Sequence, residues 1–181
     1  MFAFGRRQSS LIALAAGTLY AIQTIIGLAS PQAETFAGVS DYALEAVFVA
    51  ALLLTLPALL TVYQYGIGAG RLGLAGCYTA AGGTALMLIS AAATLVGGAN
   101  ALGLLFVLGL LAAALGQLLL GAAVARAKLL PAWAGLGLAL ALPVSVLLAS
   151  YGGGMFVAAA WMIIGGALFP RIGTRVGTPA S

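Results

Sequence analysis

The stretch ALGLLFVLGLLAAALGQLLLGAAVA, residues 101–125, decides the fold of this chain. It carries no charged side chain, and it exceeds the roughly 20 apolar residues that an α-helix needs to cross the hydrocarbon core of a bilayer. Arg126 and Lys128 follow it directly, as is usual where a helix leaves the membrane on the cytoplasmic side. The stretch therefore predicts a transmembrane helix.

The rest of the sequence has the same apolar character. Apolar residues make up 64% of the 181 positions and charged residues only 6%, which leaves too little polar surface to coat a water-soluble globule. Short connections that contain glycine, proline or charge separate the apolar stretches. We expect an all-α fold, a polytopic membrane helix bundle, in which residues 1–181 form a single transmembrane domain with spans at about 10–30, 42–65, 74–96, 101–125, 131–150 and 152–169.

Charged residues are divided between alternate connections. Basic residues precede the first span, follow the last span or lie in every second connection, whereas acidic residues lie in or beside the connection between the first two spans. Because lysine and arginine are retained in cytoplasmic connections, this division predicts a multi-pass protein of the cell's inner (plasma) membrane with both termini in the cytoplasm. The basic residues are Arg6, Arg7, Arg71, Arg126, Lys128, Arg171 and Arg175, and the acidic residues are Glu34, Asp41 and Glu45.

The net charge of +4 does not indicate nucleic-acid binding. The basic residues are scattered singly at span ends, without the clustering or the interleaved aromatics of a nucleic-acid surface. Positions of this kind suit contact with anionic lipid headgroups. We expect the lipid bilayer to be the main partner, and no nucleic acid.

Several residue types that carry membrane chemistry are missing or isolated. The chain has no histidine, which excludes histidine-ligated haem, histidine zinc sites and a histidine general base. Cys77 has no second cysteine for dithiol exchange, and Asp41 and Glu45 lie on the outer side, away from any cytoplasmic donor substrate. We therefore expect no catalytic residue, no metal, no cofactor and no enzymatic activity. A lipid-modifying enzyme is the least favoured function.

A small polar group is expected in the outer half of the bundle. Tyr20, Gln23 and Thr24 share one face of the first span through their i, i+3, i+4 spacing, and Glu45 lies about one turn into the second span. Glu45 has two interpretations, a hydrated carboxylate at headgroup level or a member of a ligand-binding pocket that opens outward. In the second interpretation all four residues contact the ligand.

Small residues at helical spacing predict close helix contacts. Lipid supplies little hydrophobic drive between helices, so tight packing depends on glycine and alanine. On the first span the stripe is Ala13, Gly17 and Ala21, and on the fourth it includes Ala112 and Gly116. Such stripes pack helices within one bundle, but the first span can also present its stripe to another membrane subunit.

Two family resemblances accompany these features. The basic turn followed by residues 130–135, LPAWAG, resembles the small six-span integral membrane proteins of high-GC bacteria that carry domain-of-unknown-function labels, a likeness that implies no particular activity. The length, the six spans and the small-residue stripe are similar to the substrate-binding subunits of energy-coupling-factor vitamin transporters. That likeness implies vitamin binding, with Ala13, Gly17 and Ala21 as the docking stripe.

Two functions follow from the sequence. The shortage of buried polar groups favours an accessory or scaffold subunit of a membrane complex. The alternative is a transport subunit that binds a small solute or vitamin in an outward-facing polar pocket formed by Tyr20, Gln23, Thr24 and Glu45.

Overall fold

The computed structural model describes residues 5–29, 38–65, 70–97, 102–127 and 131–169. Glu34, Lys128, Arg171 and Arg175 lie outside these residues. The described part of the chain is all-α, as expected. Its helices are α1 (Arg6–Ala29), α2 (Val39–Tyr65), α3 (Gly70–Gly97), α4 (Gly103–Ala127), α5 (Ala132–Leu147) and α6 (Gly154–Leu168), with a 3₁₀ turn, η1 (Ala149–Tyr151), between the last two.

Helix length separates two groups within the bundle. Among the described residues, α1, α2, α3 and α4 are long and apolar enough to cross a membrane, whereas α5 and α6 are apolar but have only 16 and 15 residues. The fifth helix ends earlier than the expected 131–150, because Leu148 leaves the helical conformation and η1 follows it. Gly152 then takes a positive φ of 82°, which favours glycine, and this reverses the chain into α6.

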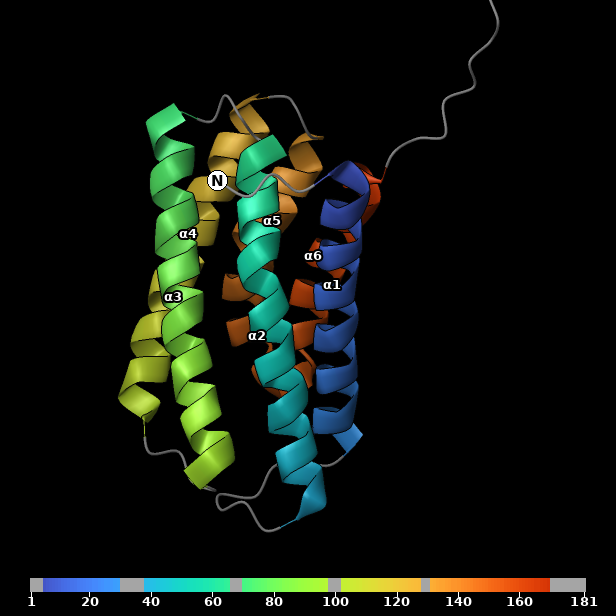
Figure 1. Ribbon diagram of the computed structural model, residues 1–181, viewed down its shortest axis with the longest axis vertical. Coiled ribbons are helices and arrows are strands. Elements are labelled where there is room, and N and C mark those ends of the chain that lie inside the picture. The colour runs from blue at the N-terminus through green and yellow to red at the C-terminus, as the bar shows by residue number, and fades with distance from the viewer. Residues whose placement is uncertain (1–4, 30–37, 66–69, 98–101, 128–130, 170–181) are drawn as a thin grey trace, which may run out of the picture.

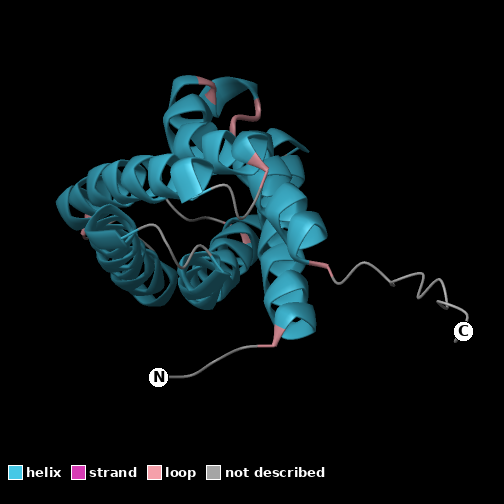
Figure 2. Ribbon diagram, turned by 90° about the horizontal axis from the view of Figure 1, so that it is seen from above, coloured by secondary structure: helices cyan, strands magenta, loops and turns pink. Residues whose placement is uncertain are grey.

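The six helices form a closed ring. Each helix packs against the helices that precede and follow it in the chain, and α6 closes the ring by packing along α1 (Figures 1 and 2). Consecutive helices run in opposite directions, so every helix end lies at one of two ends of the bundle.

Backbone contact holds α3 to α4. A Cβ added to Gly76 would lie 2.5 Å from the backbone nitrogen of Leu120, and one added to Gly109 would lie 2.8 Å from the carbonyl oxygen of Gly83. Only small residues permit such an approach. The motif Gly-x₃-Ala-x₂-Gly stands on both antiparallel helices, so this seam is close to two-fold symmetric: Gly76, Ala80 and Gly83 on α3 face Gly109, Ala113 and Gly116 on α4.

Similar contacts join α1 to α6. Ala13 is fully buried, and a Cβ on Gly17 would lie 2.8 Å from the carbonyl oxygen of Ala158. The Ser10 hydroxyl donates a hydrogen bond of 2.6 Å to the carbonyl oxygen of Gly165. The first two residues of the stripe therefore pack inside the bundle, and Ala21 is half-buried.

The expected stripe on the fourth span lies at the α3–α4 seam, with one difference. Gly116 contacts the backbone of α3, where an added Cβ would lie 2.5 Å from the Cα of Ala80. Ala112 is only half-buried, and Ala113 is the alanine that is buried with Gly116. The i, i+3 neighbour therefore packs more deeply than the i, i+4 neighbour that the sequence suggested.

Two prolines lie inside helices, Pro57 in α2 and Pro143 in α5. Both helices stand between the tightly joined pairs α1–α6 and α3–α4 in the ring. A proline removes one backbone hydrogen bond from the helix interior. The two interrupted helices therefore stand between these pairs, although the first part of α5 also packs closely against α4 through Gly135 and Gly121.

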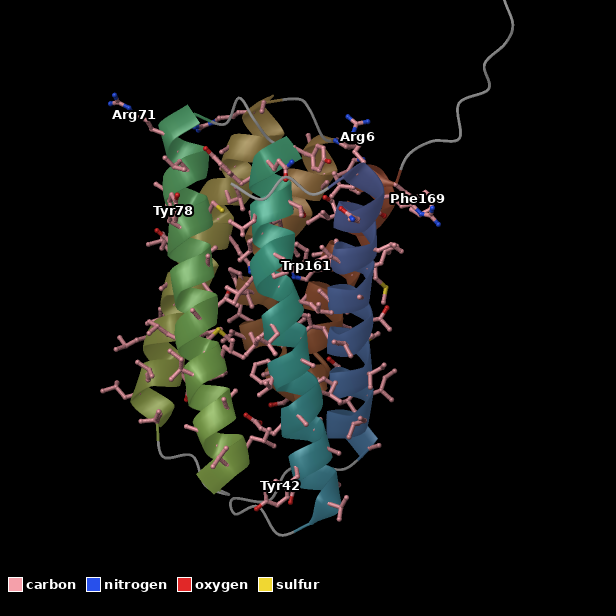
Figure 3. All side chains as sticks on the ribbon, viewed as in Figure 1. Arg6, Tyr42, Arg71, Tyr78, Trp161 and Phe169 are labelled. Atoms are coloured by element: carbon pink, nitrogen blue, oxygen red, sulfur yellow. The ribbon has the colours of Figure 1, made fainter. Side chains whose placement is uncertain are left out.

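Described charges segregate to opposite ends of the bundle. Arg6 and Arg71 lie at one end and Tyr42 at the other (Figure 3). Since α4 is antiparallel to α3, Arg126 lies at the same end as Arg71, and we call this the basic end. Asp41 lies in the first turn of α2 at the other end, the acidic end, where its Oδ2 accepts a hydrogen bond of 3.1 Å from the Gly38 amide.

Candidate ligand cavity

A cavity of about 650 Å³ lies inside the ring, in the half of the bundle nearer the acidic end, and residues of all six helices line it. Its floor is buried and includes Tyr20, Leu142 and Val157. Its rim includes exposed residues, among them Leu28 and Val146. From Tyr20 to Leu28 the cavity follows α1 for about 12 Å, at 1.5 Å per helical residue.

Aromatic and aliphatic side chains form one wall. The ring of Phe48 on α2 meets Tyr20 edge-on at a centroid distance of 6.4 Å, and it lies 6.0 Å from the ring of Phe106 on α4. Met87 and Leu110 continue this wall on α3 and α4. Edge-on contacts are favourable for aromatic rings, so the contact with Tyr20 helps to hold the Phe48 ring in place in this wall.

The hydroxyl group of Tyr20 has a partner within the protein. It lies 3.3 Å from the Thr55 hydroxyl of α2, and Thr55 in turn donates to the carbonyl oxygen of Ala51 at 2.8 Å. Because a threonine hydroxyl has one proton, Tyr20 is the donor of the pair. The Tyr20 ring therefore lines the cavity while its hydroxyl joins α1 to α2.

Polar groups on the opposite wall come from α1 and α5. The Thr24 hydroxyl donates to the carbonyl oxygen of Tyr20 at 2.7 Å, so its proton is engaged. Gln23 and Ser145 line the cavity and have no hydrogen-bond partner among the described residues. Each can therefore bond to a molecule in the cavity.

Glycines bring α1 close to the turn between α5 and α6. A Cβ on Gly154 would strike the Thr24 hydroxyl, and the Gln23 Oε1 lies 3.7 Å from the same position. A Cβ on Gly152 would lie 3.1 Å from the Leu28 side chain. Because Gly152 and Gly154 have no side chains, α1 can approach this turn closely. Gln23 therefore lies beside the start of α6.

The structure brings three of the four expected ligand-binding residues to the cavity. Tyr20, Gln23 and Thr24 line it, but Glu45 is not part of its lining. The reason is helical geometry: Leu44 and Phe48, one turn apart, face the cavity, and Glu45 is rotated from Leu44 by about 100°. Glu45 is half-buried beside the site.

Sequence reasoning missed most of the lining. Phe48, Phe106 and Leu142 are apolar residues in apolar helices, and nothing in their local pattern separates a lining residue from one that faces lipid. Ser145 had a detectable signal, because it is a hydroxyl residue two positions after Pro143 in an otherwise apolar span.

The site offers no metal centre within the described ranges, where no group of three or more histidine, cysteine, aspartate or glutamate residues could hold an ion. None of the described lining residues carries a charge. Comparisons of the chain with family models, with curated proteins and with solved structures give no match.

Proposed function

We propose that this chain is an integral membrane protein that crosses the bilayer six times and binds a small, uncharged molecule in its cavity without altering it chemically. The observation that carries the proposal is a cavity of about 650 Å³ to which all six helices contribute. Its size lies within the roughly 300–1,000 Å³ that is usual for sites of small ligands, and its mainly apolar lining with a few polar groups is also usual.

The proposed orientation has both termini in the cytoplasm and the cavity on the opposite side of the membrane. Arg6, Arg7, Arg71 and Arg126 support it, since all four lie at the basic end. In this proposal α5 and α6 also cross the membrane, and η1 with its flanking residues adds to the length of these two short helices.

Packing of α1 favours ligand binding over the accessory or scaffold function. Docking of a partner through the first span requires the stripe of Ala13, Gly17 and Ala21 to face outward. Ala13 is fully buried and Gly17 contacts the backbone of α6, so most of the stripe serves the bundle itself.

The lining defines the chemistry of the ligand. Burial of a charged ligand without a partner is costly, and the described lining offers no charge to balance it. Gln23 and Ser145 supply an amide and a hydroxyl, which suit a hydroxyl or carbonyl group on an otherwise apolar molecule.

Native mass spectrometry of protein purified in mild detergent tests the proposal, together with a matched pair of variants. Leu142→Trp places an indole at the floor of the cavity, whereas Leu140→Trp alters a leucine of the same helix that is 52% exposed and outside the lining. We expect the wild type and Leu140→Trp to retain a bound molecule, and Leu142→Trp to lose it. Equal retention by both variants, or a wild type that carries nothing, would refute ligand binding in this cavity.

A further inference from the structure

One face of α5 changes its surroundings along its length. Gly135, Ala139, Leu142 and Val146 share this face at spacings of one helical turn. A Cβ on Gly135 would lie 2.6 Å from the carbonyl oxygen of Gly121. The part of this face nearer the basic end therefore packs directly against the backbone of α4. Leu142 and Val146 line the cavity instead, and Val146 is 49% exposed.

Val146, near the end of α5, is exposed at a level where α4 still continues toward the acidic end. The close contacts of Gly121 with Ala139 and of Gly135 with Ala125 fix the antiparallel register, and this register sets Val146 level with Ala114. From that level α4 runs on to Gly103, a rise of about 16 Å at 1.5 Å per residue. Since α5 ends at Leu147, the helical wall of the ring stops at a lower level at α5 than at α4, and Ala149 and Ser150 of η1 line the cavity beyond it.

The gap beside the end of α5 is mainly apolar. Phe106 and Leu110 of α4, Val146 of α5, and Ala149 and Ser150 of η1 line the cavity there, and Ser150 supplies the one hydroxyl among these described residues. Phe106, Leu110 and Val146 belong to spans that carry no charged residue between Leu102 and Ala125 or between Ala132 and Leu147. In the proposed orientation the gap therefore faces lipid acyl chains.

Two polar groups of the lining that have no hydrogen-bond partner among the described residues lie on α1 and α5. Gln23 stands on α1, and Ser145 lies on the inward side of α5, about 100° around the helix from Val146. A molecule that enters through the gap passes between the apolar side chains of Phe106, Leu110 and Val146, and from inside the cavity it can reach Gln23 and Ser145. This arrangement suits an amphiphile whose polar group is small and uncharged.

We propose that the ligand is an uncharged amphiphile with one apolar chain or ring system, dissolved in the bilayer, which enters sideways between α4 and α5 and hydrogen-bonds through a hydroxyl or carbonyl group to Gln23 and Ser145. This inference rests on the proposed function and adds to it the class of ligand and the route of access. A water-soluble amphiphile shares the same chemistry, and the experiment separates the two sources.

The probe is a monoacylglycerol with a diazirine in its acyl chain, incorporated into phosphatidylcholine nanodiscs that hold the full chain. After illumination, mass spectrometry locates the labelled residues. We expect labels within residues 106–110 and 142–146 of the wild type. Val146→Trp narrows the gap and should reduce labelling to the level of Leu142→Trp, whereas Leu147→Trp, at a position 81% exposed and outside the lining, should leave it unchanged.

Two further variants keep the test decisive. Leu110→Trp narrows the gap from the α4 side and serves if Val146→Trp fails to fold. Gln23→Leu combined with Ser145→Ala removes the polar partners, and the probe should then bind at least about fivefold more weakly, as expected for loss of one ordinary hydrogen bond. Unchanged affinity would overturn the assignment of the polar wall.

Glycerol monobutyrate, which has the same headgroup but is soluble in water, distinguishes the route. Lateral access is wrong if two results occur together: glycerol monobutyrate displaces the probe equally from the wild type and from Val146→Trp, and the probe labels both proteins to the same extent. Ligand binding in the cavity would still stand. If purified wild type retains an endogenous molecule but the probe never labels the cavity, the ligand class is wrong. If neither molecule occupies the cavity, the proposed function itself fails.

Discussion

Replacement of Gly83 by alanine should force α3 and α4 apart. The added Cβ would lie 2.5 Å from the carbonyl oxygen of Gly109 and 2.8 Å from the carbonyl carbon of Ala112, and it would also strike the backbone nitrogen of Ala113. These are backbone atoms, which cannot rotate away as the end of a flexible side chain can. The distance from the added Cβ to the Gly109 carbonyl oxygen is roughly 1 Å shorter than an ordinary van der Waals contact. The two helices must therefore separate by a similar amount.

The magnitude follows from two opposed effects. Overpacking of a well-filled interface typically destabilises by about 1–3 kcal/mol, because the displaced helices lose contact along the seam. Alanine also favours the helical conformation over glycine by about 1 kcal/mol. We expect Gly83→Ala to destabilise the protein by up to about 2 kcal/mol overall.

The neighbouring residue provides the control. Gly82 is exposed, and a Cβ added there would meet nothing within 4 Å. Gly82→Ala should therefore gain the helix propensity alone, up to about 1 kcal/mol. The two variants should differ by the overpacking cost of about 1–3 kcal/mol. Since 1 kcal/mol shifts the Tm of a chain of this length by about 2–4 °C, this is about 2–12 °C in thermal unfolding followed by circular dichroism in detergent. Equal Tm values would refute the close backbone contact at this seam.

Three further changes probe other contacts. Ser10→Ala removes the hydrogen bond to the Gly165 carbonyl and should lower the free energy of unfolding by about 0.5–1.5 kcal/mol in denaturant titrations; an unchanged midpoint would show that this bond adds nothing to the α1–α6 contact. Thr55→Val leaves the buried Tyr20 hydroxyl without its partner and should cost about 1–3 kcal/mol in the same titration, whereas Thr18→Val, at an exposed hydroxyl that bonds within its own helix, should be nearly neutral; equal effects would contradict the role given to Tyr20. With the buried Cys77 retained, a membrane-impermeant maleimide should modify Ser40→Cys in intact cells and Arg71→Cys only after permeabilisation, and the reverse pattern would invert the proposed orientation.

The fold class was predictable because composition and charge act over the whole chain. Residues 101–125 and the arginines around the spans indicate a helical membrane bundle without any knowledge of packing. The all-α prediction is confirmed for the described residues, four of whose helices are long and apolar enough to cross a membrane, and the sixfold crossing and its orientation stay predictions. The position where the fifth helix ends was not predictable, since it depends on where Leu148 leaves the helix and not on local hydropathy.

The cavity was only partly predictable. Tyr20, Gln23 and Thr24 share a helical face, and that periodicity is visible in the sequence and places them together. Glu45 stands apart because the rotation of α2 about its own axis is set by packing, which directs Leu44 and Phe48 inward. The contribution of α4 and α5 depends on the closure of the ring, a long-range property that no local pattern encodes.

The position of Pro143 has a mechanical consequence for the cavity. The part of α5 that precedes it is fixed to α4 by the contact of Gly135 with Gly121, and the part that follows it carries Ser145 and Val146. With one backbone hydrogen bond missing at the proline, the helix is least stiff at this point. Under the proposed lateral access, thermal bending of the last turn of α5 would widen or narrow the gap while the glycine contacts of α4 with α3 and with the first part of α5 stay in place, so the elasticity of this helical turn would affect how fast a molecule enters or leaves.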